Sequence, residues 1–194
     1  EAYAPKASKA PAKIVTSYDY RDEQGKLLMQ VVRMAPKTFR QRRPDGEGWS
    51  WSVKDVRVVP YRLPELLAAP DAVVYLVEGE KDADRLASLG LVATCNAGGA
   101  GKWRKEHSEC LRGRNVLILP DNDDAGREHA KKAAKALLGI AAHVRVIALP
   151  DLPEKGDVSD WLEAGGCVEA LQDMLNEAPA ANAEPGEEEP EKKP

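Results

Sequence analysis

The sequence predicts an α/β fold: a central, mainly parallel sheet of about four strands flanked by helices, preceded by a small β-rich subdomain. Two observations favour this fold. From residue 73 onward, short apolar runs alternate with segments of helical character, and strands buried on both faces of a parallel sheet have such continuous apolar runs. Before residue 64, β-type segments are separated by turn residues instead, which is typical of hairpins.

Two hairpins are expected between residues 14 and 64. The segments IVTSYDY and KLLMQVVRM flank a turn at 22–25 that ends in glycine, and TFRQRR and WSWSV flank the turn PDGEG. Because side chains alternate along a strand, Arg40 and Arg42 share one face of their strand, and Trp49 and Trp51 share one face of theirs. A short helix or connector is expected over residues 61–69.

Four apolar runs after residue 73 are the predicted strands of the parallel sheet, namely VVYLVE, LVATC, NVLILP and HVRVIAL. The helices expected between and after them cover residues 79–90, 103–111, 126–139, 161–165 and 168–176. Gly90 is a typical C-terminal residue for the first of these helices.

Composition divides the chain into four regions. Residues 1–13 are rich in Ala, Pro and Lys and are predicted to be a linker; residues 178–194 are rich in Pro and Glu and are predicted to be a disordered acidic tail. Between them, 14–72 form the β-rich subdomain and 73–177 the α/β domain. Because the chain starts at Glu1 and not at Met, we expect it to be a piece of a longer protein.

The net charge of −4 hides an asymmetry. Residues 1–72 carry 13 basic and 9 acidic side chains, whereas residues 73–177 carry 13 and 18. No apolar run approaches the roughly 20 residues that span a bilayer, so a soluble, cytoplasmic protein without a membrane partner is expected. The three cysteines lack CxxC spacing, which fits a reducing compartment and gives no structural zinc site.

Acidic residues come at or after the ends of three of the predicted strands, VVYLVE, NVLILP and HVRVIAL. In open α/β sheets, the functional residues usually lie at these carboxyl ends of the strands. The acids are Glu78, Asp82, Asp121, Asp123, Asp124, Asp157 and Asp160. Each has a simpler explanation on its own, since helix starts and turns favour acids. Together, at one rim, they would repel one another, and a hard divalent cation with oxygen ligands relieves such repulsion.

Three motifs within this set resemble a known family. They are Glu-Gly-x-x-Asp at 78–82, Asp-x-Asp-x-Ala-Gly at 121–126 and Lys-Gly-Asp-x-x-Asp-Trp-Leu at 155–162. Over residues 73–176 the chain resembles a Toprim domain, with the greatest similarity to those of DnaG-type primases and of phage and plasmid primase-helicases. The resemblance implies a Toprim-like, Rossmannoid core.

The resemblance also implies roles for individual residues. Glu78 matches the family's glutamate, a metal ligand or general acid/base, and Asp121 and Asp123 match its metal-binding pair. Asp82 and Asp157 match further acids of the metal site, which takes Mg²⁺, with Mn²⁺ as an alternative. Two departures are that Asn122 stands where glycine is common and that the spacing from Asp157 to Asp160 differs from bacterial primases.

The function that this resemblance implies is that of a DNA primase core, a magnesium-dependent nucleotidyltransferase that makes short primers from NTPs on a single-stranded DNA template. A helicase, fused or separate, is an expected partner. Two alternatives stay open: a Toprim nuclease that uses the same metals for hydrolysis, and a non-catalytic DNA-binding module of a replication complex.

Basic residues are the candidate contacts to nucleotide or template. They are Arg40, Arg42, Arg43, Lys81, Lys102, Arg104, Lys105, Arg127 and Lys155. For those in 102–105, a solvated helix face is an equally good explanation. The Gly-rich segment before them is not a P-loop, because Asn96 and Trp103 replace the required glycine and hydroxyl. Trp49 and Trp51 could stack on bases, although we expect them to pack in the core.

Overall fold

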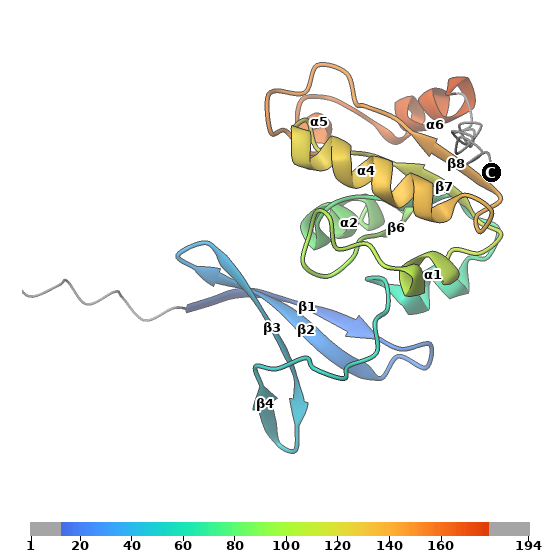
Figure 1. The fold of residues 1–194 in the computed structure, drawn as a ribbon. Coiled ribbons are helices and arrows are strands. Elements are labelled where there is room, and N and C mark those ends of the chain that lie inside the picture. The colour runs from blue at the N-terminus through green and yellow to red at the C-terminus, as the bar shows by residue number, and fades with distance from the viewer. Residues whose placement is uncertain (1–12, 179–194) are drawn as a thin grey trace, which may run out of the picture.

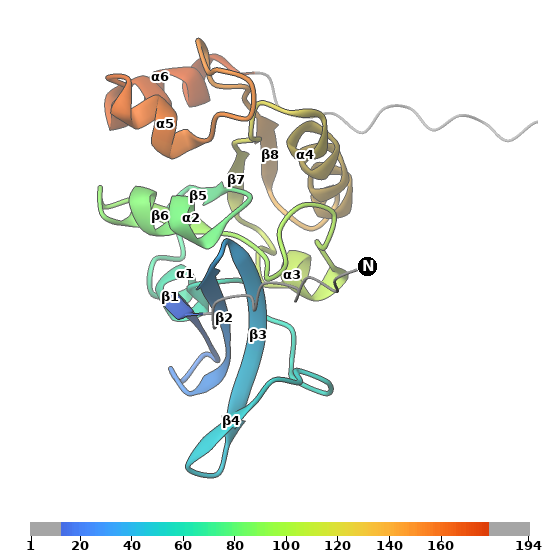
Figure 2. The same cartoon turned by 90° about the vertical axis from the view of Figure 1, so that its left-hand side faces the viewer.

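A computed structural model describes residues 13–178 and contains two four-stranded sheets (Figures 1 and 2). In both views the antiparallel sheet of strands β1–β4 lies at one end of the molecule, and helices α5 and α6 lie at the other. The predicted linker and acidic tail fall outside the described residues, except that Lys13 already belongs to β1 and Ala178 follows α6.

The antiparallel sheet consists of the two predicted hairpins, which share the central pairing of β2 with β3. Its strands, in spatial order, are β1 (Lys13–Arg21), β2 (Leu27–Ala35), β3 (Thr38–Asp45) and β4 (Gly48–Ser50). Gly46 adopts φ 59° in the β3–β4 turn, a conformation that glycine allows without steric strain. The short helix α1 (Leu63–Ala68) follows this sheet, as expected.

The second sheet is parallel throughout, and its strand order places the first and third strands in the centre. The order is β6 (Val92–Thr94), β5 (Val74–Leu76), β7 (Asn115–Ile118), β8 (His143–Val146). The helices are α2 (Glu80–Ala87), α3 (Lys105–Glu109), α4 (Asp124–Leu137), α5 (Val158–Glu163) and α6 (Val168–Glu177). The predicted α/β class is confirmed.

Both faces of the parallel sheet are buried, which explains its continuous apolar strands. Val74 and Leu76 of β5 belong to the core shared with α1 and α4, whereas Tyr75 and Val77 belong to the core shared with α2, α5 and α6. That second core also contains Tyr20 of β1. The antiparallel sheet is therefore packed directly on the α/β layer.

One polar contact specifies this packing. The Tyr20 hydroxyl, on a fully buried side chain, donates a 2.8 Å hydrogen bond to Oε1 of Glu80 at the start of α2. Tyr20 also packs against Tyr61, with 5.2 Å between ring centroids. Among residues 13–178, none of the helices is both long enough and apolar enough to cross a membrane.

Candidate active site

The two central strands of the parallel sheet deliver acids to a single cleft. Glu78 follows β5 and Asp121 follows β7, and because these strands are adjacent and parallel, their carboxyl ends meet at one edge. Glu78, Asp82, Asp121 and Asp157 all line a cleft of about 930 Å³. Four of the five acids predicted to bind metal thus share one cavity, whereas Asp123 is not among its lining residues.

Two of the acids are also helix caps, as acids at helix starts often are. Oδ1 of Asp123 accepts a 2.7 Å hydrogen bond from the Gly126 backbone at the start of α4. Oδ1 of Asp157 accepts one of 2.9 Å from the Asp160 backbone at the start of α5. For Asp123 the structural explanation and the metal-binding one are therefore compatible, because the cap occupies one oxygen of its carboxylate, whereas Oδ2 of Asp157 also accepts a hydrogen bond, from Lys81.

Asp82 connects two helices across the site. Its side chain is only 6% exposed, and Oδ1 accepts a 2.5 Å hydrogen bond from the Ser159 hydroxyl of α5. Lys81, the residue before Asp82 in α2, donates a 3.1 Å hydrogen bond to Oδ2 of Asp157. These two contacts fix the position of α5 against α2, and the role of Ser159 had no signal in the sequence.

Gly126 supports Asp121 by leaving room for its backbone. A Cβ at Gly126 would lie 2.6 Å from the Asp121 carbonyl oxygen and 2.9 Å from its nitrogen. Both approaches are too close for any side chain, so the glycine of the Asp-x-Asp-x-Ala-Gly motif allows α4 to pack against Asp121. By contrast, a Cβ at Gly79 would meet nothing closer than 3.5 Å.

Asn122, the departure from the family pattern, joins the two acidic loops. Its Nδ2 donates to the carbonyl of Leu152 over 2.8 Å and to that of Pro153 over 3.1 Å. Its backbone N–H donates to Gly156, and its carbonyl accepts from Lys155. Asn122 thereby attaches the loop that carries Asp121 and Asp123 to the loop that leads to Asp157. A glycine at this position would lack the two side-chain hydrogen bonds.

Burial and mutual repulsion shift the pKa values of these acids. Burial, reinforced by the charges of Glu78, Asp82 and Asp157, raises the pKa of Asp121 to about 8. Burial and the Asp123 charge raise the pKa of Glu78, and burial raises that of Asp82 despite the Ser159 hydrogen bond. For Asp157, burial is outweighed by hydrogen bonds from Asp160 and Lys81, and its pKa is lowered.

The donor set fits a hard divalent cation. All candidate ligands are carboxylates, and Oε2 of Glu78 is buried without a hydrogen-bond partner. Within residues 13–178, no three His, Cys, Asp or Glu side chains are placed closely enough to hold one ion together. Magnesium suits such a site, because it keeps several waters and takes only one or two protein carboxylates.

The opposite wall of the cleft is basic and aromatic. It comes from the antiparallel sheet and contains Arg33, Lys37, Phe39 and Trp51. Phe39, at 50% exposed, pairs with Arg33 across β2 and β3. Neither Arg33 nor Lys37 was predicted as a site residue, because their proximity to the acids depends on how the two sheets pack. Of the predicted basic contacts, only Lys81 lines this cleft.

Arg40 and Arg42 lie elsewhere, and the expectation that the tryptophans are core residues is wrong. Alternation along β3 directs the two arginines to the face opposite Phe39. Arg40 stacks on Trp51 with 4.1 Å from its guanidinium carbon to the ring centroid, and Arg42 stacks on Trp49 at 3.9 Å. The tryptophans remain 43% and 40% exposed. They form a surface cation–π ladder, with Trp51 reaching the cleft.

The remaining predicted basic residues are dispersed. Arg43 lines a separate groove with Lys26, Lys54 and Arg57. Lys102 and Arg104 line a third cavity. Lys105 is exposed at the start of α3, Lys155 is exposed in the loop before α5, and Arg127 donates to Asn122 and Asp124.

Comparison with known proteins confirms the Toprim resemblance. Residues 75–162 match the family model described as Toprim-like. The Gene 57 protein of Mycobacterium phage D29 is 38% identical over 77 residues, which make up 39% of this chain and 47% of that protein. The chain thus spans less than half the length of this relative.

Solved primase structures share the fold. The zinc-binding and RNA polymerase domains of the Aquifex aeolicus primase align with a TM-score of 0.65 and 23% identity, over 85% of this chain and 40% of that one. The primase fragment of the bacteriophage T7 primase-helicase gives 0.54 and 20%, over 80% and 61%. A DnaG primase catalytic domain bound to single-stranded DNA gives 0.62 and 22%, over 84% and 53%.

Proposed function

We propose that this chain, a Toprim-like domain joined to a β sheet in the fold of primase catalytic cores, is the catalytic core of a DNA primase. The reaction would be metal-dependent, template-directed synthesis of short primers from nucleoside triphosphates. The chain would act as part of a longer primase or primase-helicase. Its enzyme class would be that of a magnesium-dependent nucleotidyltransferase.

The observation that carries the proposal is the contrast between the two walls of the 930 Å³ cleft. One wall presents the carboxylates of Glu78 and Asp121, and the other presents Arg33 and Lys37 with the exposed ring of Trp51. A polymerising site needs both, because metal-bound triphosphate requires acids and a nucleic-acid strand requires cations and stacking surfaces. A cleft of this volume is large enough for a nucleotide-sized ligand.

Each wall has a distinct task in this proposal. Glu78, Asp82, Asp121, Asp123 and Asp157 would supply the ligands for divalent cations, with one or two carboxylates to each ion. Mg²⁺, or Mn²⁺ in its place, supplies charge neutralisation of the triphosphate and alignment of the attacking 3′-hydroxyl.

The chain's own residues do the positioning. Ser159 and the Gly126 backbone orient the carboxylates of Asp82 and Asp123. On the opposite wall, Arg33 and Lys37 would contact template phosphates, and Trp51 would stack on a base. Arg40 and Arg42, which cover the tryptophan rings, would extend that contact outside the cleft.

The partners follow from the same geometry. A single-stranded template suits exposed aromatic rings, because unpaired bases offer faces for stacking. The single-stranded DNA in one similar primase structure and the primase-helicase origin of another support a DNA template and a helicase partner for this chain. The NTP substrate is inferred from the acid wall.

The test is primer synthesis on single-stranded DNA with labelled NTPs and Mg²⁺. Asp121→Asn and Glu78→Gln should each lower the rate at least about a hundredfold, because each removes a group at the reacting phosphate. Asp124→Asn is the matched control. Asp124 is a fully exposed neighbour paired with Arg127, and its replacement should leave the rate within a factor of about three.

Other outcomes would redirect the assignment. Cleavage of labelled DNA that needs Mg²⁺ or Mn²⁺ and is lost in Glu78→Gln, without primer synthesis, would make the chain a Toprim nuclease. Salt-dependent DNA binding with no metal affinity by calorimetry would make it a non-catalytic module. Absence of primer from both this chain and the longer protein that contains it would refute the primase proposal.

A further inference from the structure

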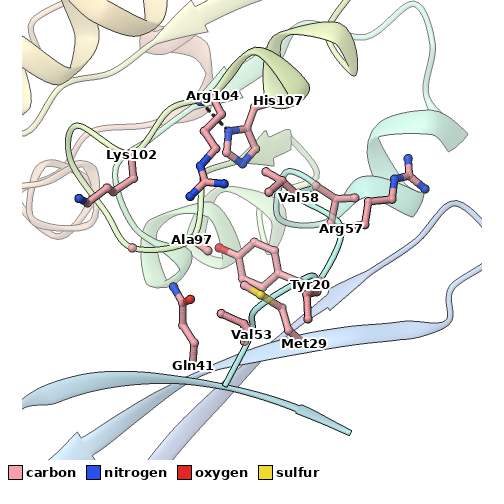
Figure 3. Close-up of a pocket in the computed structure, with 13 residues that line it drawn as sticks. Tyr20, Met29, Gln41, Val53, Arg57, Val58, Ala97, Lys102, Arg104 and His107 are labelled. Carbon is pink, nitrogen blue, oxygen red and sulfur yellow. Dashed lines mark hydrogen bonds between the residues drawn. The ribbon is translucent and has the colours of Figure 1, made fainter. Parts of the chain in front are cut away.

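A second cavity of about 290 Å³ lies beside the acidic cleft, between the antiparallel sheet, the connector 53–59 and the loop that precedes α3 (Figure 3). Gln41 and Gly98 line both cavities, so the two adjoin. The lining of this smaller pocket contains three cations and no carboxylate. That composition is the reverse of the acid wall, and the acidic cleft does not account for it.

Two of the cations are available to a ligand. Arg57 is not, because its guanidinium is paired with both carboxylate oxygens of Glu23. Within residues 13–178, the side chains of Lys102 and Arg104 form neither an ion pair nor a hydrogen bond with another residue. In Figure 3 the Arg104 guanidinium extends from the loop toward the centre of the cavity.

His107 adds a neutral donor beside Arg104. The ring is 3% exposed, and its Nδ1 accepts a 2.9 Å hydrogen bond from the Arg104 backbone. An acceptor at Nδ1 places the proton of the neutral ring on Nε2, and the structure gives no partner for Nε2 in the described part of the chain. Figure 3 shows this second nitrogen facing the cavity. Burial lowers the pKa of His107 to about 4, which keeps the ring neutral near pH 7.

The floor of the pocket is apolar and offers one amide. Met29, Val53 and Val58 contribute its apolar lining, and the fully buried Tyr20 lies next to them. The Gln41 amide projects toward the same space. Its NH₂ group can donate hydrogen bonds and its carbonyl oxygen can accept them, so it can pair with the polar edge of a base.

We propose that this pocket binds one nucleoside phosphate, with the base on the apolar floor beside Gln41 and the phosphate against Lys102 and Arg104. An apolar slot suits a base, and two unpaired cations next to a neutral imidazole donor suit a phosphate. The volume is at the lower end for ligand pockets, about 300 Å³, so it admits one nucleotide and not a dinucleotide. Because the lining contains no carboxylate, the phosphate would contact the two cations directly and not through a protein-bound metal.

This site goes beyond the proposed catalytic function, and the two can fail independently. Without metal, a triphosphate is repelled by the clustered carboxylates of the cleft, whereas the cationic pocket keeps its attraction. Because Arg33 and Lys37 on the basic wall of the cleft could also attract ATP, only the part of ATP binding in EDTA that is lost in Lys102→Ala and Arg104→Ala reports on the pocket. Primer synthesis with Mg²⁺ reports on the acid wall.

The experiment is isothermal titration calorimetry of the chain with ATP in EDTA, compared with a single-stranded DNA 12-mer and with inorganic phosphate. Lys102→Ala and Arg104→Ala should each weaken ATP binding at least about tenfold. Val58→Trp should do the same by filling the floor without changing charge. Lys131→Ala and Arg112→Ala are the matched controls, since both residues are exposed and neither lines the pocket. They should leave the affinity unchanged.

Three results would overturn the proposal. The first is no ATP binding at millimolar concentration in EDTA, and the second is ATP binding that Arg104→Ala and Val58→Trp leave intact. The third is Arg104-dependent binding of the 12-mer without binding of ATP, which would assign the pocket to a nucleotide of the template strand. Weak binding of phosphate with a larger affinity for ATP would support a contribution from the base.

Discussion

Replacing Asp121 by asparagine should stabilise the metal-free protein at pH 8 while it removes activity. The pKa of Asp121 is raised to about 8 from an ordinary value of 3.8 by burial and by the neighbouring acids. Its charged form is therefore unfavourable in the folded state. The folded pKa lies above the unfolded one, so the destabilisation is absent below pH 4, grows between pH 4 and 8, and is complete above pH 8.

The magnitude follows from this pKa difference. One pKa unit corresponds to about 1.4 kcal/mol, so a difference of roughly four units sets a ceiling of about 6 kcal/mol. Asp121 is only half-buried, and solvent screening reduces that ceiling, so we expect Asp121→Asn to raise the free energy of unfolding by about 1–3 kcal/mol. The gain should appear at pH 8 and disappear near pH 4.

The assay is urea unfolding in EDTA at several pH values for the wild type, Asp121→Asn and the exposed control Asp124→Asn. The control should change stability by less than about 0.5 kcal/mol at every pH. Added Mg²⁺ should stabilise the wild type more than Asp121→Asn, because a ligand that binds only the folded state raises its stability. A loss of stability in Asp121→Asn at pH 8, or an equal gain at pH 4 and pH 8, would refute the electrostatic argument.

Three further predictions concern the residues that support the site. Gly126→Ala should displace the Asp121 backbone and lower primer synthesis at least about tenfold, which steady-state rates would detect. Tyr20→Phe leaves the buried Glu80 carboxylate without its donor and should lower the free energy of unfolding by about 1–3 kcal/mol in urea titrations. Because burial lowers the pKa of His107 to about 4, the protein should lose up to about 3 kcal/mol as pH falls from 6.5 to 4, a loss that His107→Asn should remove.

Local patterns were sufficient to predict the elements of the fold. Both faces of β5 are buried, so Val74 and Tyr75 are equally apolar in the sequence although they belong to different cores. How the two sheets pack could not be predicted. It depends on contacts such as Tyr20 with Glu80, which are 60 residues apart and have no periodicity that connects them.

The tryptophans show why hydrophobicity alone was misleading. Trp49 and Trp51 were expected to pack the β-rich subdomain against the α/β core. The alternation that places Arg40 and Arg42 on one face of β3 also brings their guanidinium groups over these rings. Covered in this way, each ring is partly shielded from water although it stays 40–43% exposed at the surface.

That acids would gather at one edge of the sheet could be predicted, whereas the contacts that support them could not. The carboxyl ends of parallel strands meet by topology, so Glu78 and Asp121 could be placed together from strand order alone. Asn122 and Ser159 act through partners 30 and 77 residues away. Such contacts depend on the conformation of the loop that precedes α5, which includes a left-handed residue at Lys155.

The supporting contacts have a common property that argues for a site and against chance clustering. In Asp82 and Asp123 the structure commits one carboxylate oxygen to a hydrogen bond, with Ser159 or with the Gly126 backbone, and the second oxygen has no partner among the described residues. In Glu78, Oε2 is buried without one. Burying acids in this arrangement is unfavourable by itself, as the raised pKa of Asp121 indicates. A fold that holds Asp82 and Asp123 through one oxygen and leaves the other available would suit the proposed cation site, at a cost in stability.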